Sequence, residues 1–368
     1  MNKGYQMRVA LVHDYLNQYG GAERVLECLT EIFPNVPIYT LLYDPAKTNF
    51  RFVGKKIFTS FLDFSLVRRH HRIFIPLMPY AAKWINLGEN YDLVISATAG
   101  YAKGISYGPK TKHLCYCYTP LRYAWEVDNY FANPIYKTFF RPTFNYLKKW
   151  DYKVAQKPDK IITLSNYISQ KIKSCYGREA EVIYPPLDTK KFFFNSKIKP
   201  ENYYLAAGRL MHYKNFHIIV EAFNRLGWPL KIVGLGPEFK SLKRMAGPNI
   251  EFLSFVTNDD ELRQIYAKAK AFIFASIEDF GLVMAEAQAC GAPVVALAAG
   301  GALEIVKDGE NGLFFPSPKV KDLIEALNRF NQAQFDRKLV ALSVKKFAKE
   351  EFKKRLQKIL KMYYNIKI

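Results

Sequence analysis

The segment of residues 272–315 constrains the fold of this chain more than any other. Residues 271–275 form a short apolar run without alternation, which is typical of a strand buried on both faces of a parallel sheet. Good helix formers follow at 282–290, and a glycine and a proline then end the predicted helix. Residues 293–297 are predicted to form the next strand, and 302–306 a short helix. This is a βαβ unit whose loops leave the carboxyl ends of the strands, where open α/β sheets bind ligands.

Two carboxylates in this unit indicate a ligand with hydroxyl groups. Glu278 precedes the helix and Glu286 lies inside it, with seven residues between them. Carboxylates accept hydrogen bonds well from pairs of hydroxyls. The N–H groups of Phe280, Gly281 and Leu282, at the predicted helix N-terminus, suit an anion. A phosphate and several hydroxyls in one pocket describe a nucleotide sugar, although two glutamates at this spacing are a weak signal by themselves.

The string that contains both glutamates is far more specific. It runs E-D-F-G-L-x-x-x-E-A-x-A-x-G-x-P-V-V-A-x-x-x-G-G-x-x-E from Glu278 to Glu304. It resembles the donor-binding motif of the family 4 retaining glycosyltransferases. That resemblance covers nearly the whole chain and implies the α/β GT-B fold, in which two Rossmann-like domains face a central cleft.

The length and one proline pair predict how the chain divides. A chain of 368 residues suggests two domains at about 150 residues each, and a hydrophobic content of 49% is enough for two cores. Pro185 and Pro186 break structure, so the boundary is expected there. The resemblance implies an acceptor-side domain over residues 1–186, a nucleotide-sugar-binding domain over 187–348, and a last helix over 349–368 that crosses back onto the first domain.

A glycine pair follows the first predicted strand. Residues 7–12 are apolar and strand-like, 13–20 are expected to form a loop, and Gly20 and Gly21 open a helix with one apolar face. An isolated pair of this kind is as often only a tight turn. The motif H-D-Y-x4-G-G-A-E-R-V, however, resembles the N-terminal loop of the same family, which faces the donor phosphate and the acceptor. Gly20 and Gly21 are therefore expected to approach a ligand closely.

Two basic residues follow the first predicted strand of the second domain. Gly208 and Arg209 come directly after residues 203–207, and Lys214 lies at the expected start of the next helix. Arginine and lysine at such a turn can neutralise a pyrophosphate, although a lone basic pair is more often a solvated turn. The match to the family pattern G-R-L-x-x-x-K favours the phosphate role for both.

One position departs from the family pattern. The segment C-Y-C-Y-T-P-L-R-Y-A-W-E resembles the O-antigen-type mannosyltransferases that use GDP-mannose, in which a histidine precedes the Thr-Pro. Here that position is Tyr118. Its hydroxyl could replace the histidine as a donor to the sugar, the pocket could take a different sugar, or transfer could be lost. Because Arg209, Lys214, Glu278 and Glu286 are all kept, substitution is the expected outcome.

The charge of the chain indicates an acidic partner. A net charge of +21 and a pI near 9.5 suit nucleic acid, an anionic membrane or a phosphorylated substrate. Residues 55–84 mix aromatic and basic side chains, which suits an anionic membrane interface, nucleic acid, or a helix with a solvated basic face. No nucleic-acid recognition motif appears. We therefore expect an anionic membrane surface as a partner and no nucleic acid.

Cysteine use and hydropathy bear on location. Five cysteines without framework spacing favour a reduced compartment. No secretory h-region and no apolar run of about 18 residues is found. A cytoplasmic protein, peripheral on the cytoplasmic face of the membrane, is expected.

No cofactor or metal is expected, because the chain lacks Asp-x-Asp and two cations already face the predicted pyrophosphate.

These observations predict the transfer of a hexose, preferably mannose from GDP-mannose, to a lipid-linked or glycan acceptor in cell-surface polysaccharide synthesis. Retention of anomeric configuration is implied by the resemblance. Arg209 and Lys214 would stabilise the departing diphosphate, Glu278 would hold sugar hydroxyls, and Glu286 would accept from the ribose. The alternatives are a UDP-sugar-dependent transferase of the same fold, a catalytically retired nucleotide-sugar-binding protein, and a basic nucleic-acid-binding protein.

Overall fold

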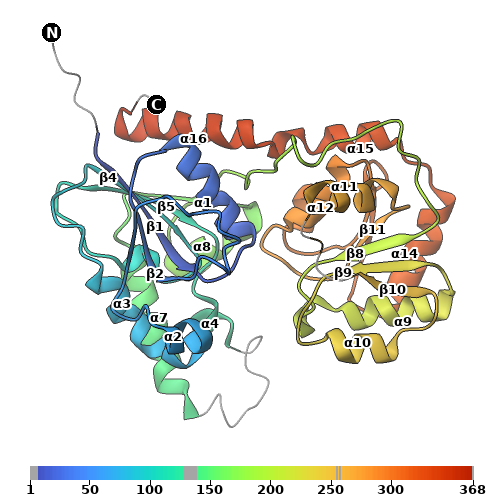
Figure 1. The fold of residues 1–368 in the computed structure, drawn as a ribbon, viewed down its shortest axis with the longest axis horizontal. Coiled ribbons are helices and arrows are strands. Elements are labelled where there is room, and N and C mark those ends of the chain that lie inside the picture. The colour runs from blue at the N-terminus through green and yellow to red at the C-terminus, as the bar shows by residue number, and fades with distance from the viewer. Residues whose placement is uncertain (1–6, 128–138, 254–255, 257, 367–368) are drawn as a thin grey trace. The chain divides into compact units, whose positions relative to one another are not determined.

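The computed structural model describes residues 7–127, 139–253, 256 and 258–366 (Figure 1). The chain forms two compact units. The first comprises the chain up to Pro186 together with the residues from Phe352 onward, and the second is Leu187–Glu351. Each unit is a parallel sheet with helices on both faces, so the two predicted Rossmann-like α/β domains are present.

The first unit is built on a seven-stranded sheet with the order β3-β2-β1-β4-β5-β6-β7, in which every pair of neighbours is parallel. The strands are β1 (Val9–Leu16), β2 (Ile38–Tyr43), β3 (Ile57–Thr59), β4 (Leu93–Thr98), β5 (Lys112–Cys117), β6 (Lys160–Thr163) and β7 (Glu181–Val182). The helices are α1 (Gly21–Ile32), α2 (Ser65–His70), α3 (Met78–Trp84), α4 (Arg122–Trp125), α7 (Arg141–Ala155) and α8 (Asn166–Tyr176), with 3-10 helices η1 (His71–Leu77) and η2 (Ala102–Gly104). Central β4 is buried along its whole length, as expected for a strand covered on both faces.

Strand β1 is longer than its sequence predicts. Residues 13–16, expected to begin a loop, continue the strand and pair with β2 as far as Leu16. The sequence did not predict this extension, because His13 and Asp14 are polar and polar residues are typical of loops. In the structure both side chains are buried at the carboxyl end of the sheet. Asp14 is held there by the Thr98 hydroxyl at 2.8 Å and by backbone N–H groups of the loop after β4, including that of Ala102 at 2.6 Å.

The second unit is built on a six-stranded parallel sheet with the order β10-β9-β8-β11-β12-β13. The strands are β8 (Tyr204–Ala207), β9 (Leu230–Val233), β10 (Ile250–Leu253), β11 (Phe272–Phe274), β12 (Val294–Leu297) and β13 (Gly312–Phe315). The helices are α9 (Phe216–Leu226), α10 (Phe239–Met245), α11 (Asp259–Lys268), α12 (Leu282–Ala289), α13 (Ala302–Ile305), α14 (Val320–Gln332) and α15 (Arg337–Ser343). Helices α9, α10 and α14 lie on one face of the sheet, and α11 and α12 on the other (Figure 1).

The segment of residues 272–315 folds as predicted. Strand β11, helix α12, strand β12 and helix α13 follow one another within one or two residues of the expected bounds. Helix α12 is almost wholly buried, because alanines on its inner faces let it lie close to the sheet and to its neighbours. The βαβ interpretation of this segment is therefore confirmed.

The last helix is α16 (Lys349–Tyr364), and its residues from Phe352 onward belong to the first unit. The ring of Phe352 packs edge-on against Tyr116 of β5 at 5.9 Å between centroids. Lys353 Nζ lies 2.9 Å from a carboxylate oxygen of Glu31 in α1. Apolar packing and an ion pair thus attach this helix to the N-terminal sheet.

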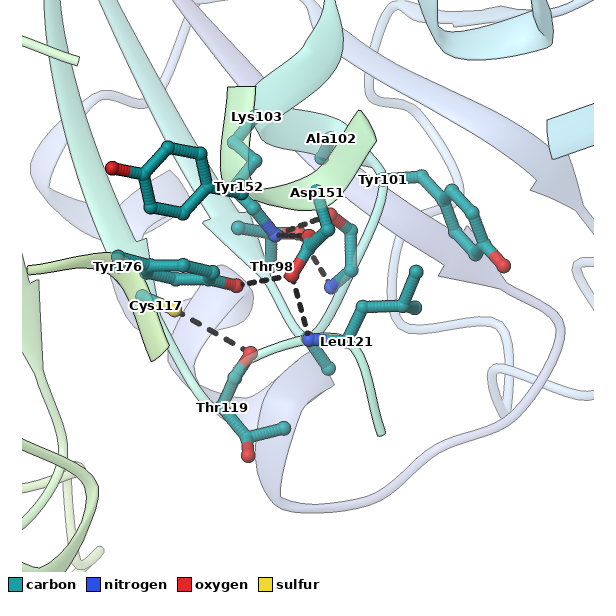
Figure 2. A network of polar contacts seen from close by, with 12 residues as sticks. Thr98, Tyr101, Ala102, Lys103, Cys117, Thr119, Leu121, Asp151, Tyr152 and Tyr176 are labelled. Atoms are coloured by element: carbon teal, nitrogen blue, oxygen red, sulfur yellow. Dashed lines mark hydrogen bonds and ion pairs between the residues drawn. The ribbon is translucent and has the colours of Figure 1, made fainter. Parts of the chain in front are cut away.

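A buried ion pair joins several helices of the first unit (Figure 2). Lys103 Nζ in η2 lies 2.7 Å from Asp151 Oδ1 in α7, with the two side chains 1% and 0% exposed. Asp151 Oδ2 accepts from the Tyr176 hydroxyl at 2.6 Å, the Trp125 indole N–H at 2.8 Å and the Leu121 backbone N–H at 3.2 Å. Four segments are thereby linked through one carboxylate.

Candidate functional site

The second sheet reverses its connectivity between β8 and β11, which are neighbours in space. From β8 the chain continues to β9 on one side, and from β11 to β12 on the other. Ligands of open α/β sheets bind outside the carboxyl ends of the strands at such a switch point. The structure places most of the predicted site residues in the two loops that leave it, namely Gly208, Arg209 and Lys214 after β8, and Glu278, Phe280, Gly281 and Leu282 after β11.

The two loops meet through an ion pair that the sequence did not reveal. Lys214 Nζ lies 2.5 Å from Glu278 Oε1, and the two side chains are 16% and 23% exposed. An ammonium has three N–H donors and a carboxylate has two oxygens with several lone pairs. This partly exposed pair therefore has donors and acceptors for a ligand beyond those that it uses in holding itself together.

The backbone around Lys214 is shaped by residues with positive φ. Gly208 has φ +147°, and a side chain there would begin 3.5 Å from Lys214 Nζ. Asn215 starts α9 in the left-handed region, and its side-chain N–H donates to the Ala275 carbonyl at 2.9 Å. Because Ala275 directly follows β11, this bond ties the turn that carries Lys214 to the strand that leads to Glu278. Arg209 is exposed in the same turn.

The glycine pair of the long motif supports the loop that carries Glu278. The N–H of Gly301 donates to the Glu278 carbonyl at 2.8 Å. A Cβ on Gly301 would lie 2.3 Å from Phe280 Cα, and one on Gly300 would lie 2.5 Å from the Glu278 carbonyl oxygen. Only glycine allows the loop after β12 to approach this closely.

Helix α12 begins at Leu282, directly after Gly281, which has φ +94°. Phe280 is buried and packs edge-on against Phe347 at 5.1 Å between centroids. This anchor sets the direction in which the chain enters the helix. The first backbone N–H groups of α12 are thereby placed at the carboxyl edge of the sheet, in the same loop as Glu278.

Glu286 has different surroundings from Glu278. It is 1% exposed, and its Oε2 accepts from the Tyr266 hydroxyl of α11 at 3.3 Å. The carboxylate is therefore held on the face of α12 that meets α11. Its predicted contact with ribose hydroxyls stays a prediction.

Gly20, Gly21 and Tyr118 lie in the first unit. Gly20 is the N-cap of α1, and its backbone N–H donates to Glu23 Oε2 at 2.7 Å. Glu23 is 2% exposed, and its other oxygen lies 3.6 Å from Nε2 of the buried His13. Glu23 is not among the residues predicted for the site, although a glutamate three residues after an N-cap has the spacing of a capping box. It fixes the conformation of the glycine loop.

The hydroxyl of Tyr118 already has a protein partner. It donates to the Ala22 carbonyl in the first turn of α1 at 2.9 Å, and the side chain is buried. Burial raises the pKa of Tyr118 well above its usual value, so the hydroxyl keeps its proton. Because that proton is directed at the Ala22 carbonyl, Tyr118 can interact with a sugar only by accepting a hydrogen bond from a sugar hydroxyl at its oxygen lone pairs.

Two family models match the chain in succession. Residues 19–191 match the model described as Glycosyltransferase Family 4, and residues 188–341 match the one described as Glycosyl transferases group 1. An uncharacterised glycosyltransferase of Methanocaldococcus jannaschii is 30% identical over 197 residues, 52% of this chain and 55% of the relative. The O-antigen chain mannosyltransferase C of Escherichia coli is 25% identical over 194 residues, 50% of this chain and 52% of the relative. The chain thus spans about half the length of these curated relatives.

A similar fold is found in a crystal structure from Anabaena. HepE in complex with UDP and glucose superposes with a TM-score of 0.68 and 18% sequence identity, over 97% of this chain and 100% of that one. At this identity the likeness shows the fold, which is the GT-B arrangement of two Rossmann-like domains.

Proposed function

This chain has the two domains of a family 4 glycosyltransferase, and from that premise we propose that it transfers a hexose from a nucleotide sugar to an acceptor hydroxyl. The observation that carries the proposal is the Lys214–Glu278 pair at the switch point of the second sheet. In the proposed complex, the Lys214 ammonium meets the diphosphate and the Glu278 carboxylate accepts from sugar hydroxyls. Both groups are partly exposed, so a ligand can reach them.

The proposed reaction exchanges one bond at the anomeric carbon for another. The bond from this carbon to the diphosphate breaks, the acceptor oxygen bonds to the carbon, and the acceptor proton leaves with the diphosphate. Negative charge grows on the departing diphosphate, where Lys214 and Arg209 stabilise it. Glu278 holds hydroxyls of the sugar, and the first N–H groups of α12 bind the sugar and the phosphate. We propose retention of configuration, following the family resemblance.

GDP-mannose is the proposed donor. Support comes from the resemblance of residues 115–126 to O-antigen-type mannosyltransferases and from the mannosyltransferase relative in E. coli. A UDP-sugar is the alternative, because HepE was crystallised with UDP and glucose. The proposed acceptor is a lipid-linked or glycan hydroxyl met at the cytoplasmic face of a membrane, in the synthesis of a cell-surface polysaccharide.

The first test combines binding with turnover. GDP-mannose, UDP-glucose, GDP and UDP are compared by thermal shift, since a ligand that binds only the folded state raises the melting temperature. Release of nucleoside diphosphate then reports transfer. We expect GDP-mannose to give both responses. A rise in melting temperature without turnover on any acceptor would favour a retired binding protein. A response to UDP-glucose alone would mean that the donor is a UDP-sugar and not GDP-mannose.

Two variants test the assignment of the site. Arg209→Ala and Glu286→Gln should each weaken binding of the nucleotide sugar, because a hydrogen bond to a charged group contributes about 1.5–3 kcal/mol. Lys268→Ala is the control, since Lys268 pairs with Glu201 before β8, at the opposite end of the strands. Unchanged affinity in both test variants, measured by calorimetry, would contradict the assignment.

Metal independence is a further part of the proposal. Lys214 and Arg209 supply the positive charge that a divalent ion supplies in other transferases. Turnover should therefore continue in EDTA. Complete loss of turnover in EDTA, restored by magnesium, would show that the two cations are insufficient.

A further inference from the structure

One face of the first unit carries large aromatic side chains that the core does not use. Phe61, Tyr80 and Trp84 are 50%, 59% and 69% exposed. Phe61 and Trp84 meet edge-on at 5.6 Å between centroids, and Tyr80 stacks on Tyr146 of α7 at 6.5 Å. These four residues, called the aromatic face below, come from three segments of the chain that the fold brings together.

The aromatic face is not the outer part of an unfinished core. Helix α3 buries Met78, Ala81 and Ala82 against the sheet, which completes its inner side. Tyr80 and Trp84 are on the other side of the same helix. Aliphatic side chains continue this surface along α2 and η1, which leads directly into α3: Leu66, Ile73 and Leu77 are 55%, 74% and 45% exposed.

The segments that carry the aromatic face are strongly basic. Between residues 47 and 83 the sequence has eight lysines and arginines and a single acid, Asp63. The Asp63 carboxylate is paired within this segment, because Arg68 Nε donates to its Oδ1 at 2.6 Å. The one acid of α7, Asp151, is buried in its pair with Lys103. No carboxylate of these segments therefore offsets the exposed bases, which include Arg69 and Arg72.

Three lysines gather beside the aromatic face. Burial lowers the pKa of Lys157, and the positive charges of Lys83 in α3 and Lys153 in α7 lower it further. Lys83 and Lys153 are exposed. Ammonium groups that repel one another in the folded protein would be stabilised by a bound anion.

We propose that this face lies on an anionic lipid bilayer, with the rings and aliphatic side chains in the interface and the bases on headgroup phosphates. Aromatic rings favour the level of the headgroups, and lysine stems extend along apolar surface while their charges reach phosphate. Nucleic acid is the less suitable partner. Its bases would stack on the rings, but the exposed leucines and isoleucine have no role in stacking.

Within the described residues, no helix is both long and apolar enough to span a bilayer. Contact through this face would be peripheral and reversible, and weakened by salt. The inference deepens the proposed function by naming the surface on which a lipid-linked acceptor would be met. Binding to vesicles is nevertheless measured without turnover, so the two proposals can fail separately.

The test is co-sedimentation of the full chain with phosphatidylcholine vesicles, with and without phosphatidylglycerol. We expect binding only to the anionic vesicles. Lys83→Ser with Lys153→Ser should weaken it by roughly 25-fold, because each lysine near an anionic surface contributes about fivefold. Ile73→Ser with Trp84→Ser should weaken it as well, even in low salt, where charge attraction alone is strongest.

The matched controls lie in the second unit. Lys307→Ser with Lys321→Ser removes the same charge, and Leu303→Ser with Leu339→Ser removes exposed apolar surface. Neither should change vesicle binding, and unchanged thermal melting would show that the variants fold. Full binding by both test pairs would overturn the proposal. So would binding of a short DNA duplex at physiological salt that competes with vesicles and depends on the same residues. Vesicle binding without any transfer activity would instead overturn the proposed function alone.

Discussion

Both units contain a close lysine–carboxylate pair, and the two pairs have opposite surroundings. Lys103 and Asp151 in the first unit are 2.7 Å apart and 1% and 0% exposed. Lys214 and Glu278 in the second unit are 2.5 Å apart and 16% and 23% exposed. The ionic groups are chemically alike, so their surroundings must distinguish a structural pair from one suited to a ligand.

The pair in the first unit is enclosed by partners. Asp151 accepts three further hydrogen bonds, and Lys103 also donates to the Gly100 carbonyl at 2.6 Å. Burial by itself would lower the pKa of Lys103, but the Asp151 carboxylate raises it overall, so the pair stays ionised. Its capacity for hydrogen bonding is used within the protein, which is what a structural role requires.

The pair in the second unit is supported by backbone and is partly exposed. Gly300 and Gly301 let the loop after β12 lie against the main chain of Glu278 and Phe280, and the side-chain atoms nearest to a Cβ on Gly208 belong to Lys214 and Phe216. Because both charged groups are partly exposed, a ligand could replace water at each of them. Exposure and the number of internal partners thus distinguish the enclosed pair from the pair that we propose binds a ligand, whereas the distance between the charges does not.

The largest expected effect is on the enclosed pair. Asp151→Ala should lower the free energy of unfolding by about 3–5 kcal/mol, because it leaves the Lys103 charge buried without its partner. Lys103→Met combined with Asp151→Leu should lower it by less than Asp151→Ala, since no charge is then stranded. Urea denaturation compares both variants with the wild type, and Glu179→Ala, in an exposed pair, is the control that should leave the midpoint unchanged. An unaltered midpoint in Asp151→Ala would remove the distinction between the two pairs.

The next effect is on turnover. Lys214→Ala should reduce kcat by about 10²–10³-fold, as for the loss of one group that stabilises transition-state charge. Its melting temperature should change little, because the pair is partly exposed. Lys268→Ala is again the control. A large fall in melting temperature with unchanged turnover per folded molecule would make the second pair structural, like the first.

A buried histidine in the first unit should make stability depend on pH. His113 lies between the Ser96 hydroxyl at 2.7 Å and the Tyr107 hydroxyl at 3.0 Å, and burial lowers its pKa from 6.5 to about 3. Below pH 6.5 the unfolded chain binds a proton that the folded chain refuses, so stability falls as the pH falls from 6.5 towards 3. The loss should be roughly 2 kcal/mol by pH 5. The free energy of unfolding of His113→Gln should fall less over this pH range than that of the wild type, when the unfolding of both proteins is followed by tryptophan fluorescence.

The smallest expected effect is at Tyr118. Tyr118→Phe should lower the free energy of unfolding by about 1 kcal/mol, because it removes the hydrogen bond to Ala22. If the oxygen also binds the donor sugar, turnover should fall by about tenfold, and Tyr118→His should keep measurable activity. A stability loss with full turnover would assign the hydroxyl to Ala22 alone.

Local patterns predicted much of this molecule. The order of strands and helices in residues 272–315 is predicted from sequence, and the structure shows that close backbone packing there requires glycine at positions 300 and 301. The sequence also indicated the candidate residues in both loops at the switch point of the second sheet. His13 and Asp14 were misassigned to a loop, because buried polar residues in a strand look like loop residues until their partners are known.

The sequence by itself determined the α/β class, the βαβ unit of residues 272–315, and which side chains are candidates for a ligand. These depend on periodicity and on glycine and proline, which act within a few residues. Only the tertiary structure decided that Lys214 pairs with Glu278, that Glu286 meets Tyr266, and that the Tyr118 hydroxyl is directed at Ala22. Such contacts join segments distant in sequence. They depend on strand order and on the rotation of each helix against its sheet, and no local stretch of sequence specifies either.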